Sequence, residues 1–204
     1  STLRYDALPN PKVTPPVTMT RADVLFRLGD LLAHLGHDDE RAGAHFRAAL
    51  AVQATHAPSH AGLAWLAVQR EDFDAAVAHC ERALALDGDD FMINFHCAEA
   101  LVWRHLQAGA EVGEGSPGSA GADLSRAQTL FMKSLQGNPG FGEAFVGFGM
   151  TAAMTEGGDL KPAIMLLEGA RHLMPARADV VANLAILYER DGQQDKARQL
   201  VEEI

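Results

Sequence analysis

The stretch "AAVAHCERALALDGDD", residues 75–90, decides the fold because its frame of small and large residues recurs along the chain. Ala76 is followed by Cys80 after three intervening residues, by Ala83 after two more, and then by a glycine. "RAQTLFMKSLQGNPG" from residue 126 and "PAIMLLEGARHLMPAR" from residue 162 have the same frame. Residues four and then three positions apart share one face of an α-helix, so each stretch predicts a helix. The frame begins at five alanines, which are Ala42, Ala76, Ala127, Ala163 and Ala197.

A second pattern precedes each of these predicted helices. An apolar residue followed by Gly or Ala stands within another stretch of helical apolar spacing. The repeated unit is therefore two helices joined by a turn. Small residues at fixed positions allow the two helices to approach closely, and larger residues fill the space between units. The five pairs are Leu28-Gly29, Leu63-Ala64, Cys97-Ala98, Phe148-Gly149 and Leu184-Ala185.

These patterns together resemble the tetratricopeptide repeat (TPR) family, whose unit is about 34 residues long. The last unit fits well, with Val181, Leu184, Ala185, Tyr188 and Ala197 at family positions. The resemblance covers about residues 22–204 and implies an all-α fold, a right-handed superhelical solenoid of antiparallel helix pairs. Residues 1–19, with four prolines, are expected to form an extended N-terminal segment before the array. The expected units are 22–56, 57–90, 91–141, 142–177 and 178–204.

The third unit is longer than the others. From the small residue of its first helix to the alanine of its second takes 29 residues, against 12 to 14 in the other four units. About 17 extra residues therefore lie near 105–122, within a stretch that contains five glycines. No Lys-Ser or Lys-Thr follows these glycines, which argues against a phosphate-binding loop. We predict an insertion at the turn inside the unit, either a surface loop or a flap that contacts a partner.

Composition excludes several classes of function. The net charge of −10 argues against nucleic acid or an anionic membrane as a partner, because phosphate binding needs clustered Lys and Arg. No apolar run approaches the roughly 18 residues of a membrane span. The N-terminus lacks the layout of a signal peptide, and a cytoplasmic location is expected. No membrane insertion and no cofactor are expected.

No catalytic constellation is present in the sequence, so a non-enzymatic protein is expected. His34 with His37, and His56 with His60, each offer at most two ligands, whereas zinc takes three or four, so no metal site is expected. Cys80 and Cys97 fall at packing positions of adjacent units. They are expected to be buried small hydrophobes, and a disulfide between them stays open.

The resemblance implies that the first helix of each unit lines a concave binding surface. Chaperone-binding members place Lys and Asn at the fifth and ninth positions of this helix. Here those positions hold pairs such as Phe26 with Asp30 and Phe95 with Glu99, so a carboxylate clamp is absent. The surface is instead predicted to be apolar, with residue types that are enriched at binding hot spots. The predicted peptide-binding residues are Phe26, Trp65, Met92, Phe95, Trp103, Val146, Met150, Met154 and Ile186.

The sequence thus predicts an adaptor that binds an apolar or amphipathic segment of a protein partner. Two alternatives remain, the repeat portion of a larger enzyme and a self-associating scaffold. Ala197, Leu200, Val201 and Ile204 of the last helix keep repeat-packing spacing, so this C-terminal edge is expected to be covered, for example by a second copy of the chain. The apolar residues of 1–19 either pack on the array or belong to a simple leader.

Overall fold

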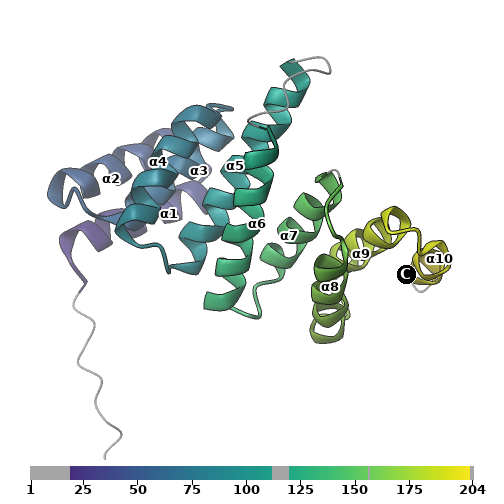
Figure 1. The fold of residues 1–204 in the computed structure, drawn as a ribbon. Helices are drawn as coiled ribbons and strands as arrows, with labels where there is room; N and C mark the ends of the chain where they lie inside the picture. The colour runs from purple at the N-terminus through teal and green to yellow at the C-terminus, as the bar shows by residue number, and fades with distance from the viewer. Residues whose placement is uncertain (1–18, 112–119, 156, 203–204) are drawn as a thin grey trace, which may run out of the picture.

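The computed structural model describes residues 19–111, 120–155 and 157–202. These residues form ten α-helices and no strand, which confirms the all-α repeat fold expected from the sequence (Figure 1). The helices are α1 (Arg21–His34), α2 (Asp39–Val52), α3 (Ala57–Gln69), α4 (Phe73–Leu86), α5 (Phe91–Glu111), α6 (Ala120–Gly137), α7 (Gly142–Met154), α8 (Lys161–Leu173), α9 (Ala178–Arg190) and α10 (Gln194–Glu202).

Side chains from the turns cap several helices. Thr20 and Asp23 form a capping box at the start of α1, where each side chain accepts from the other residue's backbone N–H. Asp72 caps α4, and Asp90 accepts a hydrogen bond from the backbone N–H of Ile93 in α5 at 2.9 Å. The aspartates of these turns therefore act as helix caps.

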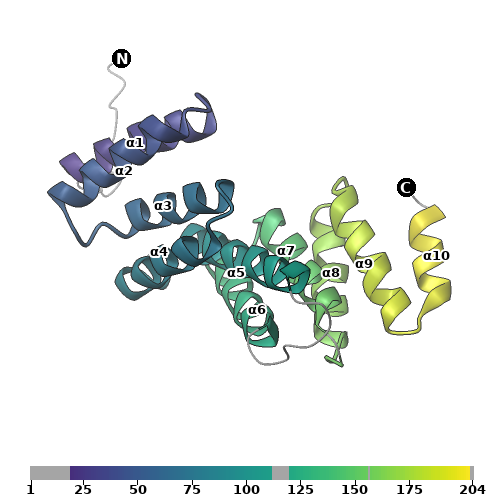
Figure 2. The ribbon, with the colours of Figure 1, turned by 90° about the horizontal axis from the view of Figure 1, so that it is seen from above.

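The helices are arranged as five consecutive pairs. Each odd-numbered helix packs against the even-numbered helix that follows it and against the next odd-numbered helix. Figure 2 shows the pairs following one another along an arc, with α1 and α2 at one end and α10 at the other. The odd-numbered helices thereby form one continuous layer, α1–α3–α5–α7–α9.

Glycines set the distance between helices of neighbouring units. Phe46 of α2 is buried between Gly29 of α1 and Gly62 of α3, and a Cβ atom at either glycine would lie 2.7 Å from its ring. A Cβ at Gly147 of α7 would likewise overlap the buried ring of Phe131. The predicted close approach at small residues is confirmed, and each ring occupies the volume that a side chain would otherwise need.

The insertion near 105–122 is not a simple loop. α5 has 21 residues and α6 has 18, so residues 105–111 and 120–122 continue these helices, and the expectation of a loop is wrong for them. In Figure 1 the two helices extend beyond the rest of the array at this end. Arg104 donates to both carboxylate oxygens of Asp123, at 2.9 and 2.7 Å, which joins the helices before they extend. Residues 112–119 lie outside the described part of the chain.

The two ends of the array differ in polarity. At the C-terminal end, Ala197 and Leu200 are already buried, because α10 packs back onto α9. These two residues are therefore covered by α9 itself, without the further helix or second copy of the chain that the sequence led us to expect. Val201 is 63% exposed, and Ile204 lies outside the described residues. The more apolar edge is on α1, which exposes a stripe of large aliphatic residues, Val24, Leu28, Leu31 and Leu35.

Two Gly→Ala substitutions test whether glycine sets the helix spacing. Gly147→Ala should lower the free energy of unfolding by about 1–3 kcal/mol, because the added methyl overpacks against Phe131. Gly169→Ala in α8 is the matched control, since nothing lies within 4 Å of its added Cβ. This control should gain about 0.5–1 kcal/mol through helix propensity. Urea unfolding of both variants measures the difference, and equal effects of the two substitutions would contradict the packing account.

Residues 107–121 are predicted to be dispensable for folding. Replacing them by a short Gly-containing turn keeps the Arg104–Asp123 ion pair and the buried Leu124. The free energy of unfolding should change by less than about 1 kcal/mol, because Gln107, Gly109 and Gly121 are exposed. Circular dichroism with thermal unfolding provides the measurement. Loss of a single cooperative transition would show that the insertion is part of the core.

Candidate functional site

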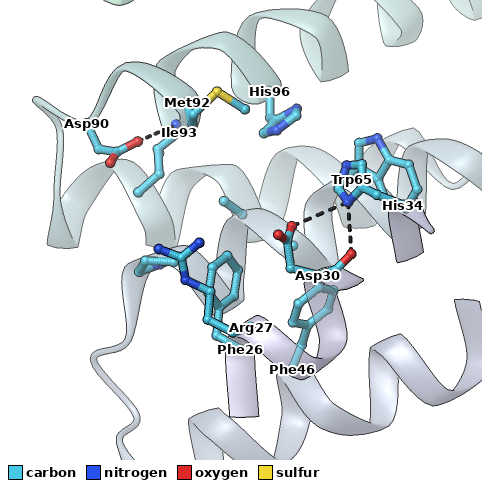
Figure 3. A pocket seen from close by; sticks show the side chains of 13 residues that line it. Phe26, Arg27, Asp30, His34, Phe46, Trp65, Asp90, Met92, Ile93 and His96 are labelled. Carbon is cyan, nitrogen blue, oxygen red and sulfur yellow. Dashed lines mark hydrogen bonds and ion pairs between the residues drawn. The ribbon is translucent and has the colours of Figure 1, made fainter. Parts of the chain in front are cut away.

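A pocket lies between α1, α3 and α5, and we call it the N-terminal pocket (Figure 3). Its volume is about 340 Å³. Phe26 comes from α1, Trp65 from α3 and Met92 from α5, so three successive units contribute to it. Its lining residues are Phe26, Arg27, Asp30, His34, Phe46, Pro58, Ala61, Gly62, Trp65, Asp90, Met92, Ile93 and His96.

One wall of this pocket combines an aromatic face with charge. The ring of His34 stacks on the indole of Trp65, with ring centroids 4.9 Å apart. His34 Nδ1 lies 3.0 Å from the carbonyl oxygen of Asp30 and 3.3 Å from its carboxylate Oδ1 (Figure 3). These contacts pack the ring of His34 against one face of the indole and hold His34 to its own helix.

A second pocket, which we call the central pocket, lies between α5, α7 and the start of α9 and also has a volume of about 340 Å³. Trp103, Leu106 and Met150 are the most exposed large apolar residues in it, at 48%, 42% and 40%. Helix α5 forms a wall of both pockets, because Met92 and His96 face one and Phe95 faces the other. The lining residues are Phe95, Glu99, Val102, Trp103, Leu106, Phe131, Glu143, Val146, Gly147, Met150, Arg177 and Asp179.

The two pockets are built in the same way. In each, a phenylalanine from an even-numbered helix packs on a glycine of the next odd-numbered helix, Phe46 on Gly62 and Phe131 on Gly147. Ring and glycine are separated by 16 residues in both cases. Because these glycines have no side chain to cover the ring, the ring forms part of the pocket lining. The packing that joins two units therefore also shapes the binding surface.

Ion pairs fix the rim of the central pocket. Arg177 donates to Glu143 at 2.9 Å and to Asp179 at 2.7 Å, so one guanidinium joins two carboxylates. The hydrogen bond from Arg177 lowers the pKa of Asp179. Glu99 Oε2 lies 3.3 Å from His96 Nδ1 on the same helix, at the boundary between the two pockets. The rim is thus mostly acidic, around an apolar interior.

Seven of the nine predicted peptide-binding residues line these pockets. Phe26, Trp65 and Met92 line the N-terminal pocket. Phe95, Trp103, Val146 and Met150 line the central pocket. Phe95 differs from the rest because it is only 9% exposed, with its ring centroid 4.8 Å from that of Phe141, so it is chiefly a core residue. Met154 and Ile186 lie at the end of α7 and on α9 and line neither pocket.

Sequence reasoning missed the charged residues of both pockets. Asp30 and Glu99 occupy the ninth position of their helices and were considered only for a carboxylate clamp. Their recurrence four residues after Phe26 and Phe95 is the signal that could have identified them. Arg177 carried no such signal, because it reaches Glu143 from 34 residues away in the sequence.

The histidines and cysteines do not form a metal site. Within 19–111, 120–155 and 157–202, no three His, Cys, Asp or Glu side chains are placed to hold a metal ion. His56 contacts Asp23 at 3.1 Å and Ser59, while His60 lies 3.5 Å from His79. Burial lowers the pKa of both His60 and His79, so this pair favours the neutral state.

Cys80 and Cys97 are buried free thiols, which settles the choice that the sequence left open. A hydrogen bond with Cys80 and burial raise the pKa of the Cys97 thiol. A thiol that stays protonated is a poor nucleophile, so this pair acts as packing between α4 and α5.

Comparisons with known proteins agree with the fold. A family model described as tetratricopeptide repeat matches residues 57–90, which cover α3, α4 and the turn after them. No curated protein matches the chain. Within the described residues, no helix combines the length and apolar character that crossing a bilayer requires.

Three solved structures illustrate the likeness. YrrB, a TPR protein with an unusual peptide-binding site, is 20% identical, with a TM-score of 0.68 over 89% of this chain and 83% of that one. PilF of Pseudomonas aeruginosa is 18% identical, with a TM-score of 0.69 over 89% of this chain and 73% of its own. The O-GlcNAc transferase of Thermobaculum terrenum is 16% identical, with a TM-score of 0.58 over 76% of this chain but only 27% of the transferase.

At these identities the structural likeness concerns the fold. The family model matches one helix pair directly, and the other four pairs stack in the same order on either side of it. The chain therefore has the fold of a tetratricopeptide-repeat array, and one of its five helix pairs matches the family model directly.

Proposed function

We propose that the protein binds a peptide segment of a protein partner in the N-terminal and central pockets, and that it does so without catalysis. The observation that carries the proposal is the gathering of half-exposed Trp and Met side chains on one layer of helices. Trp103, Met92 and Met150 are 48%, 37% and 40% exposed, although all three are costly to leave in water. Exposed apolar surface gathered in this way is typical of an interaction site.

The shape of the surface supports a segment with spaced apolar side chains. The two pockets share α5 as a wall. A single segment that crosses α5 can therefore place one apolar side chain in the pocket next to α1 and another in the pocket next to α9. Methionine adapts to ligands of different shape, while Trp65 has one face packed against the ring of His34. The similarity to YrrB, a TPR protein with a peptide-binding site, supports the same class of function.

Truncation of each tryptophan tests this proposal. Twelve-residue peptides are first selected on the immobilised chain from a random phage-displayed library, and their affinity is measured by calorimetry. Trp65→Ala and Trp103→Ala should each weaken binding about thirtyfold or more, because truncating a hot-spot aromatic costs about 2 kcal/mol or more. Leu173→Ala and Val52→Ala are the controls, since both are exposed apolar residues on even-numbered helices.

These controls should bind the selected peptides as the unaltered chain does. If all four variants bind equally well, the peptides attach elsewhere and the assignment of the site is wrong. If the selection enriches no peptide, the proposed function itself fails.

A second candidate follows from the partial likeness to the glycosyltransferase. We infer that such an array can also serve as the partner-binding portion of a larger enzyme, because the similarity covers 27% of the transferase. Determining the complete reading frame tests this alternative. A catalytic domain in the same frame would support it, and a frame that encodes only the repeats would exclude it.

A further inference from the structure

The two pockets carry an excess of negative charge. Five carboxylates line them, Asp30 and Asp90 in one, and Glu99, Glu143 and Asp179 in the other. Only two arginines accompany them, Arg27 and Arg177, which leaves an excess of three negative charges when histidine is neutral. The rest of the chain does not offset this charge, since its net charge is −10.

Not all of these carboxylates are free to meet a ligand. Glu143 and Asp179 are both bound by Arg177. Asp90 caps α5 through the backbone N–H of Ile93. Asp30 and Glu99 remain, and within the described part of the chain each is paired with a histidine of its own helix at 3.3 Å.

Asp30 and Glu99 are accessible as well as incompletely neutralised. Their side chains are 40% and 38% exposed. Their histidine partners are charged only when protonated, and neither carboxylate forms an ion pair with a lysine or arginine among the described residues. Asp30 lines the N-terminal pocket and Glu99 lines the central pocket, and each pocket also contains a tryptophan.

The aromatic residues favour the same ligand charge. A Lys or Arg over the face of an indole gains about 0.5–2 kcal/mol from the ring quadrupole, while a carboxylate gains nothing there. Trp65 and Trp103 place one indole in each pocket, and because one face of each stacks on His34 or Phe73, such a contact would use the other face. An acidic segment would meet like charge at both rims, which selects against it.

We propose that the two pockets select a basic amphipathic segment, whose apolar side chains enter the pockets and whose Lys or Arg side chains meet Asp30 and Glu99. This inference rests on the proposed function and names the chemistry of its partner. We expect the contacts of Asp30 and Glu99 to contribute selectivity, because charged pairs at a rim mainly affect the choice of partner and the rate of association.

Three synthetic peptides test the inference. They share twelve positions and the same Leu, Phe and Met residues, and differ only in carrying four Lys, four Glu or four Gln. Affinity is measured from tryptophan fluorescence and by calorimetry at 50 and 300 mM salt. The Lys peptide should bind at least about tenfold more tightly than the Glu peptide at low salt, and the ratio should fall at high salt through screening.

Paired charge variants locate the effect. Asp30→Lys with Glu99→Lys should abolish or reverse the preference for the Lys peptide. Glu40→Lys with Glu189→Lys changes the net charge equally at two exposed residues outside both pockets, and should keep the preference. The milder double variant Asp30→Asn with Glu99→Gln should weaken the preference for the Lys peptide. It replaces the double-lysine variant if that variant does not fold.

The outcomes separate the two proposals. Equal affinity for all three peptides would overturn the charge selectivity while leaving peptide binding intact. An equal loss of preference in the pocket variant and in its control would also overturn it, because only the net charge would then matter. Failure of all three peptides to bind would overturn both the selectivity and the proposed function.

Discussion

The contact of a phenylalanine ring with a glycine of the next unit is the interaction on which the rest of this structure depends. Phe46 is 1% exposed and fills the space between Gly29 and Gly62, and Phe131 does the same at Gly147. A side chain at these glycines would force the helices apart, because close-packed interiors have no spare volume. The distance between successive units is therefore set by the absence of a Cβ atom.

The binding surface is a consequence of this packing. Gly62 and Gly147 both lie on odd-numbered helices. The rings that pack on them, Phe46 and Phe131, each line a pocket as well as being part of the core. At the junction between the second and third units Cys80 takes the place of the ring, and His96, rather than glycine, stands 16 residues after it. The ring-on-glycine contacts thus lie on either side of a junction without one. This alternation accounts for two pockets with α5 between them.

Charged residues surround the apolar interior of both pockets. Arg177 joins carboxylates from α7 and α9 and so fixes the orientation of two units, but it leaves the rim acidic. In the part of the chain that the structure describes, Asp30 and Glu99 have no arginine partner and lie beside rings that are already packed in place. The apolar interior of the pockets provides contact area, and we expect the carboxylates at the rim to select partners by their charge.

The sequence by itself determined the repeat, the number of helix pairs and the side of each helix that faces its neighbours. Those features follow from local spacing, since residues such as Ala76, Cys80 and Ala83 share a helix face whatever surrounds them. It also assigned Trp65, Trp103 and Met150 to the first helices of their units, and in the structure each of them lines a pocket.

Only the tertiary structure decided how those side chains are grouped. Phe95 occupies the same position in its helix as Phe26, yet it packs into a cluster with Phe131 of α6 and Phe141 at the start of α7. Spacing could not show that residues 105–111 continue α5, because Arg104 and Asp123 pair across two helices. The acidic rim likewise depends on Arg177, just before α9, meeting Glu143 in the first turn of α7, 34 residues earlier. Contacts between units depend on the exact superhelical geometry, which no single repeat contains.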